Sequence, residues 1–167
     1  MQIIIVAAVS ENLVIGKNND LAWHLPADLA FFMETIENAW LITGRKSYES
    51  AQGGEVFSNN RNFIIITRNK QYCPPNGMVA NSLGEALVIA KANHVKRLCI
   101  LGGATIYQQA MDIADSMIIT EVHEYFEGDT FFPEIDKNIW RETSRMSFSK
   151  DLENPYDYSF VTYQKND

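Results

Sequence analysis

Residues 3–9 read IIIVAAV, an apolar run without a polar residue. Similar runs follow at residues 39–43 (AWLIT), 62–67 (NFIIIT), 97–101 (RLCIL) and 116–120 (SMIIT). Runs that are continuous rather than alternating are typical of strands covered on both faces, as in a parallel sheet. Helical patterns lie between them, so the sequence predicts an α/β fold.

Three segments between these runs carry helix signals. Pro26 suits a first helical position and is followed by an apolar stripe at helical spacing, which consists of Leu29, Phe32, Met33 and Ile36. Ser82 and Glu85 form a capping box. Gly103 leads into a third segment, ATIYQQAM.

The C-terminal part has a different pattern. WRETSRMSFS (residues 140–149) and YDYSFVTYQ (residues 156–164) alternate in polarity and are joined through a turn-forming Asn154-Pro155 pair. This pattern predicts a hairpin, so the sheet should carry an antiparallel edge. We expect a single domain over residues 1–167, with AQGGEVFSNN (residues 51–60) as a mobile loop.

Composition narrows the class of function. The chain has 167 residues, of which 46% are hydrophobic, and a net charge of −7. Such a charge argues against nucleic acid or an acidic membrane as a partner. The two cysteines, Cys73 and Cys99, have no disulfide or zinc spacing, and the apolar start is too short for a signal or membrane segment. We therefore expect a soluble cytoplasmic protein without a metal site.

Asp28 stands out in AWHLPADL (residues 22–29). An acid in the first turn of a helix is favoured by the helix dipole, by roughly 0.3–1 kcal/mol, and this alone could explain it. However, bulky apolar residues surround it, namely Trp23, Leu25, Leu29, Phe31 and Phe32, and no Lys or Arg occurs from Asn18 to Ile42. A buried acid without a local partner indicates a ligand with two adjacent N–H donors, which a carboxylate accepts as a fork.

Five motifs, in order, resemble the dihydrofolate reductase family. They are VIGKNNDLAWHLPADLAFF (residues 14–32), TGRKSYES (43–50), IITRN (65–69), ILGGATIY (100–107) and EGDTFFPE (127–134). The resemblance covers nearly the whole chain. It implies a mostly parallel eight-stranded central sheet with an antiparallel C-terminal strand and about four flanking helices. It further implies NADPH-dependent reduction of dihydrofolate to tetrahydrofolate, by hydride transfer to the pterin and protonation of its N5. A monomer is expected.

The resemblance assigns a substrate site. Asp28 would grip the amidine edge of the pterin, Thr120 would hydrogen-bond to Asp28, and Trp23 would help to hold a water molecule. The remaining contacts would come from Val6, Ala7, Ala8, Leu29, Phe32 and Arg61. Arg61 would pair with the α-carboxylate of the substrate. Thr120 could equally be a plain strand residue, and Arg61 a solvated loop charge.

The resemblance also assigns an NADPH site. Arg45 and Arg68 would favour the 2′-phosphate, and a glycine pair would allow close approach of the cofactor, although such a pair also suits any tight strand-to-helix turn. The full set is Ala8, Ile15, Gly16, Leu21, Gly44, Arg45, Lys46, Ser47, Thr67, Arg68, Leu101, Gly102, Gly103, Ala104, Thr105, Ile106 and Tyr107. Ile15, Gly16 and Leu21 would belong to a loop over the nicotinamide. Asp129 would bias its closure, unless it is an ordinary turn acid.

Several positions depart from the family's usual residues. They are Ala22 (usually Pro), Met33 (often Lys), Ile36 (usually Thr) and Thr43 (often Met). Since they are expected near the entrance of the pocket, we expect trimethoprim to bind more weakly than to common bacterial enzymes. The longer segment before Arg61 leaves open whether Val56, Phe57 or Ser58 lines the aminobenzoyl pocket.

Two other functions remain possible at this level. An enzyme of the same fold, such as the reductase of the riboflavin pathway, would not need Trp23 and Asp28 in this arrangement. A nucleotide-binding regulatory module without catalysis would have no reason to keep Asp28 and the glycine pair. Turnover of dihydrofolate separates these alternatives.

Overall fold

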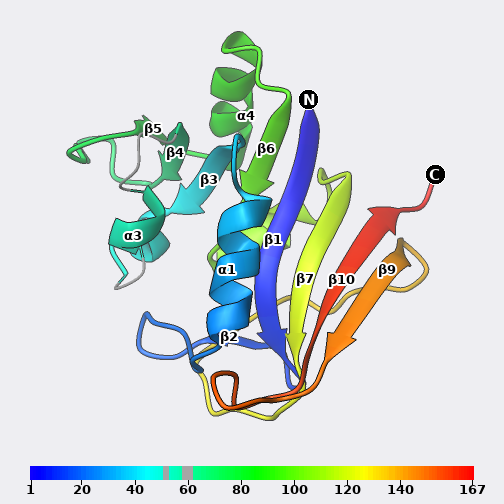
Figure 1. Cartoon of the computed structure of the whole chain (residues 1–167). Helices are drawn as coiled ribbons and strands as arrows, with labels where there is room; N and C mark the ends of the chain where they lie inside the picture. The colour runs from blue at the N-terminus through cyan, green and yellow to red at the C-terminus, as the bar shows by residue number, and fades with distance from the viewer. Residues whose placement is uncertain (51–52, 58–61) are drawn as a thin grey trace.

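The computed structural model describes residues 1–50, 53–57 and 62–167. Within these residues the chain forms one eight-stranded sheet (Figure 1). From edge to edge it contains β5 (Met78–Ala80), β4 (Phe63–Ile66), β3 (Trp40–Gly44), β6 (Arg97–Ile100), β1 (Gln2–Ser10), β7 (Ser116–Val122), β10 (Tyr158–Lys165) and β9 (Trp140–Phe148). Neighbours from β5 to β7 are parallel, and β10 is antiparallel to both β7 and β9. The predicted α/β fold with an antiparallel C-terminal strand is confirmed.

Five helical segments and a small second sheet complete the described residues. The helices are α1 (Pro26–Thr35), α2 (Arg45–Tyr48), α3 (Gly53–Phe57), α4 (Leu83–Ala92) and α5 (Ala104–Ala110). The small sheet pairs β2 (Val14–Gly16) with β8 (Thr130–Phe131). Two of the five helices, α2 and α3, are single turns, and five agrees with the expected number of about four. No helix among the described residues has the length and apolar character needed to cross a membrane.

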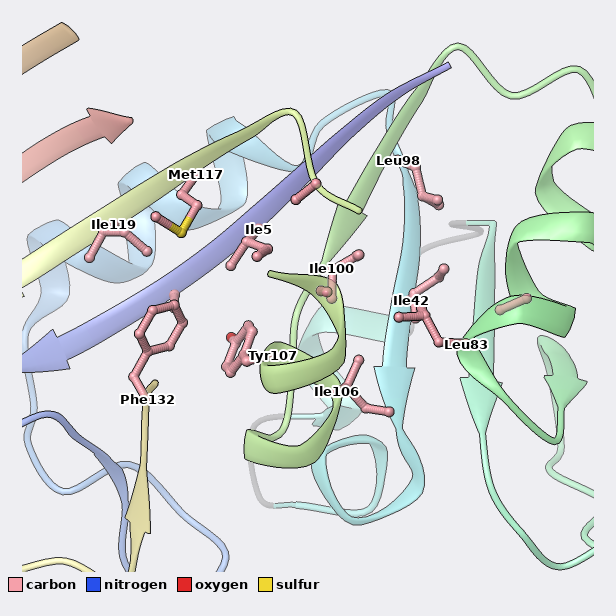
Figure 2. Close-up of a cluster of buried hydrophobic side chains, with 14 of the residues drawn as sticks. Ile5, Ile42, Leu83, Leu98, Ile100, Ile106, Tyr107, Met117, Ile119 and Phe132 are labelled. Carbon is pink, nitrogen blue, oxygen red and sulfur yellow. The ribbon is translucent and has the colours of Figure 1, made fainter. Parts of the chain in front are cut away.

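Both faces of the sheet are covered, which explains the continuous apolar runs. Ile5 of β1 packs with residues of α4 and α5 on one face, as Figure 2 shows for Ile106 and Tyr107. Ile4 of the same strand packs with Val56 of α3 and the end of α1 on the other face. Successive side chains point to opposite faces of a strand, so a strand covered twice needs apolar residues at consecutive positions.

The local signals differ in how well they are realised. Pro26 opens α1, and Ser82 caps α4 by accepting a 3.0 Å hydrogen bond from the backbone N–H of Glu85. Glu85 reaches back to the N–H of Asn81 rather than to that of Ser82. Part of the predicted mobile loop forms α3, and the rest of that segment lies outside the described residues.

Both cysteines are free, as the sequence predicted. Cys99 is fully buried in β6, where burial raises the pKa of its thiol to about 11, so it stays protonated and behaves as a core residue. Cys73 is exposed.

Candidate active site

Asp28 lies in the first turn of α1 with its side chain buried, since only 9% of the residue is exposed. Burial raises the pKa of its carboxyl from 3.8 to about 6, and a hydrogen bond from Thr120 on β7 opposes the rise. The salt bridges found among the described residues do not involve Asp28. The structure therefore places a carboxylate in an apolar wall without a cation to neutralise it.

A cavity of about 260 Å³ opens beside this carboxyl group. It lies at the carboxyl ends of β1, β6 and β7, where open parallel sheets bind ligands. Its lining includes many of the predicted site residues: Val6, Ala7, Ala8, Ile15, Gly16, Leu21, Trp23, Asp28, Leu29, Phe32, Ser47, Leu101, Gly103, Tyr107 and Thr120. Residues predicted for the substrate and residues predicted for the cofactor thus line the same cavity.

Trp23 lines the same cavity with its indole buried against Phe126, at 5.0 Å between ring centroids. Among the described residues its Nε1 is the buried side-chain nitrogen without a hydrogen-bond partner. A buried N–H without a partner is costly, so this atom calls for an external acceptor such as water.

Tyr107 connects α5 to the first strand across the floor of the cavity. Its hydroxyl donates a 2.7 Å hydrogen bond to the backbone carbonyl of Val6. Burial, and after it the nearby charge of Asp28, raise the pKa of Tyr107 far above neutral pH, so the hydroxyl remains a donor.

The glycine turn after β6 approaches the turn after β3. The N–H of Gly44 donates to the carbonyl of Gly102 at 2.7 Å. Gly102 has φ of +100°, and a Cβ there would lie 2.7 Å from the ring of Tyr107. A Cβ at Gly103 would meet the Ser47 hydroxyl at 3.4 Å. A side chain at Gly102 would therefore clash with Tyr107, whereas at Gly103, which lines the cavity, glycine leaves room for a ligand to approach the backbone.

The basic residues predicted for phosphate binding lie outside the cavity lining. Arg45 in α2 forms a salt bridge of 2.9 Å with Glu49, and the neighbouring Lys46 is exposed. Arg68, after β4, is exposed as well. Guanidinium and ammonium groups at the solvent side suit a phosphate at the mouth of such a site.

Comparison with known proteins agrees with this geometry. The family model described as "Dihydrofolate reductase" matches residues 2–165. This chain belongs to the dihydrofolate reductase family. It is 41% identical over 166 residues to a dihydrofolate reductase from Neisseria gonorrhoeae, covering 98% of both chains. It is 37% identical over 163 residues to that of Bacillus subtilis, covering 96% of this chain and 92% of the relative.

The structural similarity is equally extensive. The dihydrofolate reductase from Enterococcus faecalis, solved in complex with NADP(H) and RAB-propyl, superposes with a TM-score of 0.88 at 34% identity. The match covers 99% of this chain and 97% of the Enterococcus faecalis chain. The family resemblance noted in the sequence is confirmed.

The segment that precedes α1 is tied down at Asp129, as expected for this family. The Asp129 carboxylate accepts hydrogen bonds from the backbone N–H of Asn18 at 3.0 Å and from the Thr130 hydroxyl at 2.9 Å. These bonds, with that from Asn18 the largest cause, lower the pKa of Asp129. Because the group is fully exposed, solvent weakens these bonds, and the effect of Asp129 on loop closure stays a prediction.

Several residues predicted for the cofactor site of a dihydrofolate reductase do not line the cavity. Ile106 points from α5 into the core, near Ile42 and Ile100 (Figure 2). The others outside the cavity lining are Gly44, Arg45, Lys46, Thr67, Arg68, Gly102, Ala104 and Thr105. Arg61 and Ser58 lie outside the described residues. For all of these residues the predicted roles stay predictions.

The sequence analysis missed other residues of the cavity wall. They include His24, Phe31, Ser50, Gly53, Ile118 and Thr130, whereas Thr43 was expected near the entrance of the pocket and does line the cavity. Phe31 could have been found, because it lies three residues after Asp28 on a helix and so shares its face. Of the open alternatives in the longer segment, both Val56 and Phe57 line the cavity.

Proposed function

We propose that this chain catalyses the NADPH-dependent reduction of 7,8-dihydrofolate to 5,6,7,8-tetrahydrofolate, the form of folate used in one-carbon metabolism. The observation that carries the proposal is the buried Asp28 carboxyl, which faces a cavity without a cationic partner in a chain of this family. A flat heterocycle with two adjacent N–H donors would satisfy it.

The substrate would lie along the wall that Asp28 begins. The Asp28 oxygens accept the two N–H groups of the pterin, and the Thr120 hydroxyl holds the carboxylate in place. Apolar contacts come from Val6, Ala7, Ala8, Leu29 and Phe32. Arg61 is proposed to pair with the glutamate α-carboxylate, since a guanidinium matches a carboxylate through two parallel hydrogen bonds.

Protonation of the pterin does not require Asp28 to donate. Its negative charge raises the basicity of the bound ring, and a water molecule can deliver the proton to N5. The unpaired Nε1 of Trp23 supports this step, because it can donate a hydrogen bond to such a water molecule at the cavity wall.

The residues at the glycine turn fit NADPH, which supplies the hydride when bound. Gly103 leaves room for its approach and Gly102 allows the tight turn before it, while Ser47 and the start of α2 offer polar groups to its phosphates. Arg45 and Arg68 are proposed to select the 2′-phosphate. Ile15, Gly16 and Leu21 are proposed to cover the nicotinamide.

The proposal includes one domain, a monomeric state and a cytoplasmic location. Two free cysteines and no disulfide among the described residues support a reducing compartment. The size of the particle in sedimentation experiments tests the monomer.

The decisive experiment follows NADPH oxidation with dihydrofolate by absorbance. Asp28→Asn keeps the shape but removes the charge, so we expect kcat/KM at neutral pH to fall by at least about 100-fold. Activity should recover partly in acid, where the substrate is already protonated. Glu34→Gln, on the exposed side of the same helix, is the matched control.

Near-normal activity of Asp28→Asn at neutral pH would contradict the role of Asp28. Tight NADPH binding without turnover would favour a nucleotide-binding regulatory module. Turnover of a riboflavin precursor, but not of dihydrofolate, would favour a reductase of the riboflavin pathway.

A further inference from the structure

The N-terminus of α1 is held by a loop that is distant in sequence. Leu25, at the N-cap position, offers no side-chain acceptor to the helix. Instead the backbone N–H of Ala27 donates a 2.9 Å hydrogen bond to Oδ1 of Asn154, which lies 127 residues later in the loop between β9 and β10. The acceptor for a free N–H of the first turn therefore comes from the C-terminal hairpin.

Asn154 is built into that loop and cannot turn its amide freely. Only 6% of the residue is exposed. Its Nδ2 donates to both oxygens of Asp151, at 3.1 and 3.3 Å, and its backbone N–H donates to Asp151 at 2.7 Å. Because the carboxylate of Asp151 can only accept, the amide nitrogen must face Asp151 and the amide oxygen must face Ala27.

The same hairpin holds α1 at a second point. The ring of Phe31 stacks on that of Phe160 in β10, with 3.9 Å between centroids and 9° between planes. Phe160 is the partner of Thr120 in the β7–β10 register, and Thr120 bonds to Asp28. Ala27, Asp28 and Phe31 are thus fixed in turn by the hairpin loop, by β7 and by β10.

We propose that Asn154 is a positioning residue for Asp28: its amide oxygen closes the first turn of α1 and so sets where the carboxylate meets the substrate. The role in catalysis rests on the proposed function, whereas the effect on Asp28 itself does not. Without the cap, the first turn loosens and water reaches the carboxyl. The burial that raises the pKa of Asp28 is then partly lost.

Asn154→Ala tests this in the full chain, with Ser82→Ala as the matched control. Ser82 caps α4, which has ten residues like α1 but contributes none to the cavity. Both variants lose one helix cap, so we expect similar decreases in Tm. Only Asn154→Ala should lower the pKa of Asp28 from about 6 toward 3.8, measured by carboxyl ¹³C NMR on the ligand-free protein. Asp28→Asn assigns the signal. Tyr107 is the other titratable group coupled to Asp28, and its pKa stays far above this range.

Kinetics give the second measurement. We expect Asn154→Ala to raise KM for dihydrofolate roughly three- to tenfold, and Ser82→Ala to leave it unchanged. The double variant Asp151→Asn with Asn154→Asp exchanges the two side chains. Residue 154 then still offers an oxygen to the N–H of Ala27, and the amide at residue 151 donates to it, so KM should return toward the wild-type value. If Asn154→Ala does not fold, the milder Asn154→Ser replaces it. The serine side chain is too short to reach Ala27, so we expect the same lowered pKa of Asp28 and the same rise in KM.

The possible results are distinct. The proposal is overturned if Asn154→Ala or Asn154→Ser loses Tm like Ser82→Ala but keeps the wild-type pKa of Asp28 and the wild-type KM. A lowered pKa in a protein that never reduces dihydrofolate would sustain the positioning of Asp28 and refute the proposed function instead.

Discussion

The hydroxyl of Tyr107 donates a 2.7 Å hydrogen bond to the backbone carbonyl of Val6, and both groups are buried. The bond joins α5 to β1 at the floor of the cavity, close enough to Asp28 for the carboxylate to influence the hydroxyl. The bond thus links β1, which lines the cavity, directly to the helix that follows the glycine turn.

Tyr107→Phe should destabilise the fold because it leaves the Val6 carbonyl without a donor. We expect a loss of about 1–3 kcal/mol in the free energy of unfolding, measured by urea titration. Tyr48→Phe is the control, because the Tyr48 hydroxyl bonds to Asn76 near the surface and should cost less than about 1 kcal/mol. Equal losses in the two variants would show that burial of the Tyr107–Val6 bond does not increase its contribution to the free energy of unfolding.

The raised pKa of Asp28 predicts that this residue reduces the stability of the ligand-free protein. The folded chain binds the proton more tightly than the unfolded chain does, so stability falls as pH rises from about 4 to 6 and then stays level. A folded pKa of about 6 against 3.8 in the unfolded chain amounts to roughly 3 kcal/mol at neutral pH.

Asp28→Asn should therefore raise stability at neutral pH by about 1–3 kcal/mol, since the amide also gives up part of the hydrogen bonding of the acid. The gain should shrink below about pH 4, where Asp28 is protonated in both states. Thermal unfolding across this range measures it. A gain that does not depend on pH would mean that charge burial is not its cause.

Gly102 should not tolerate a side chain. Its φ of +100° disfavours other residues, and a Cβ would lie 2.7 Å from the Tyr107 ring. We expect Gly102→Ala to cost at least about 2 kcal/mol and to weaken NADPH binding measured by fluorescence. Gly54→Ala, with nothing within 4 Å of the added atom, should be neutral or stabilise by up to about 1 kcal/mol. A stable Gly102→Ala variant with normal NADPH affinity would contradict the proposed role of the glycine turn in NADPH binding.

Arg45 should contribute to the choice between the two nicotinamide cofactors. Its side chain is about 42% exposed, and its salt bridge with Glu49 is a surface pair that a phosphate can replace. Arg45→Gln should raise KM for NADPH by about tenfold and leave KM for NADH within about twofold, since NADH has no 2′-phosphate. Parallel changes in both constants would place Arg45 elsewhere on the cofactor or make it structural.

Weak trimethoprim binding remains a prediction, and the structure reduces the number of positions that could cause it. Ile36 is fully buried in the core and Met33 packs against the same cluster, so neither lines the cavity. Of the four departures, Thr43 alone lines it. Inhibition titrations should give a weaker constant for the wild-type chain than for Thr43→Met. Nanomolar inhibition of the wild type would refute the prediction.

Local chemistry predicted much of this fold. The continuous apolar runs predicted strands that are covered on both faces. Pro26 predicted the start of α1, and Ser82 predicted the cap of α4. The sequence also predicted that Asp28 has no cationic partner, because no Lys or Arg lies near it in the chain. In the structure, none of the salt bridges among the described residues involves Asp28.

What the sequence did not reveal depends on pairs far apart in the chain. The Tyr107–Val6 bond spans 101 residues and the Ala27–Asn154 bond 127, and neither leaves a periodic signal. Ile106 was assigned to the cofactor because it lies in a motif, but its direction on α5 places it in the core. Only packing decides which face of a short helix meets a ligand.

The position of β10 has a consequence for biosynthesis. This strand is the last in chain order but lies inside the sheet, between β7 and β9. While the ribosome still covers residues 158–165, β7 has an open edge, and Thr120 and Phe31 lack Phe160, their neighbour in β10. A nascent chain therefore completes the strand pairing behind Asp28 only when β10 has joined the sheet, and a chain truncated before residue 158 would be prone to proteolysis.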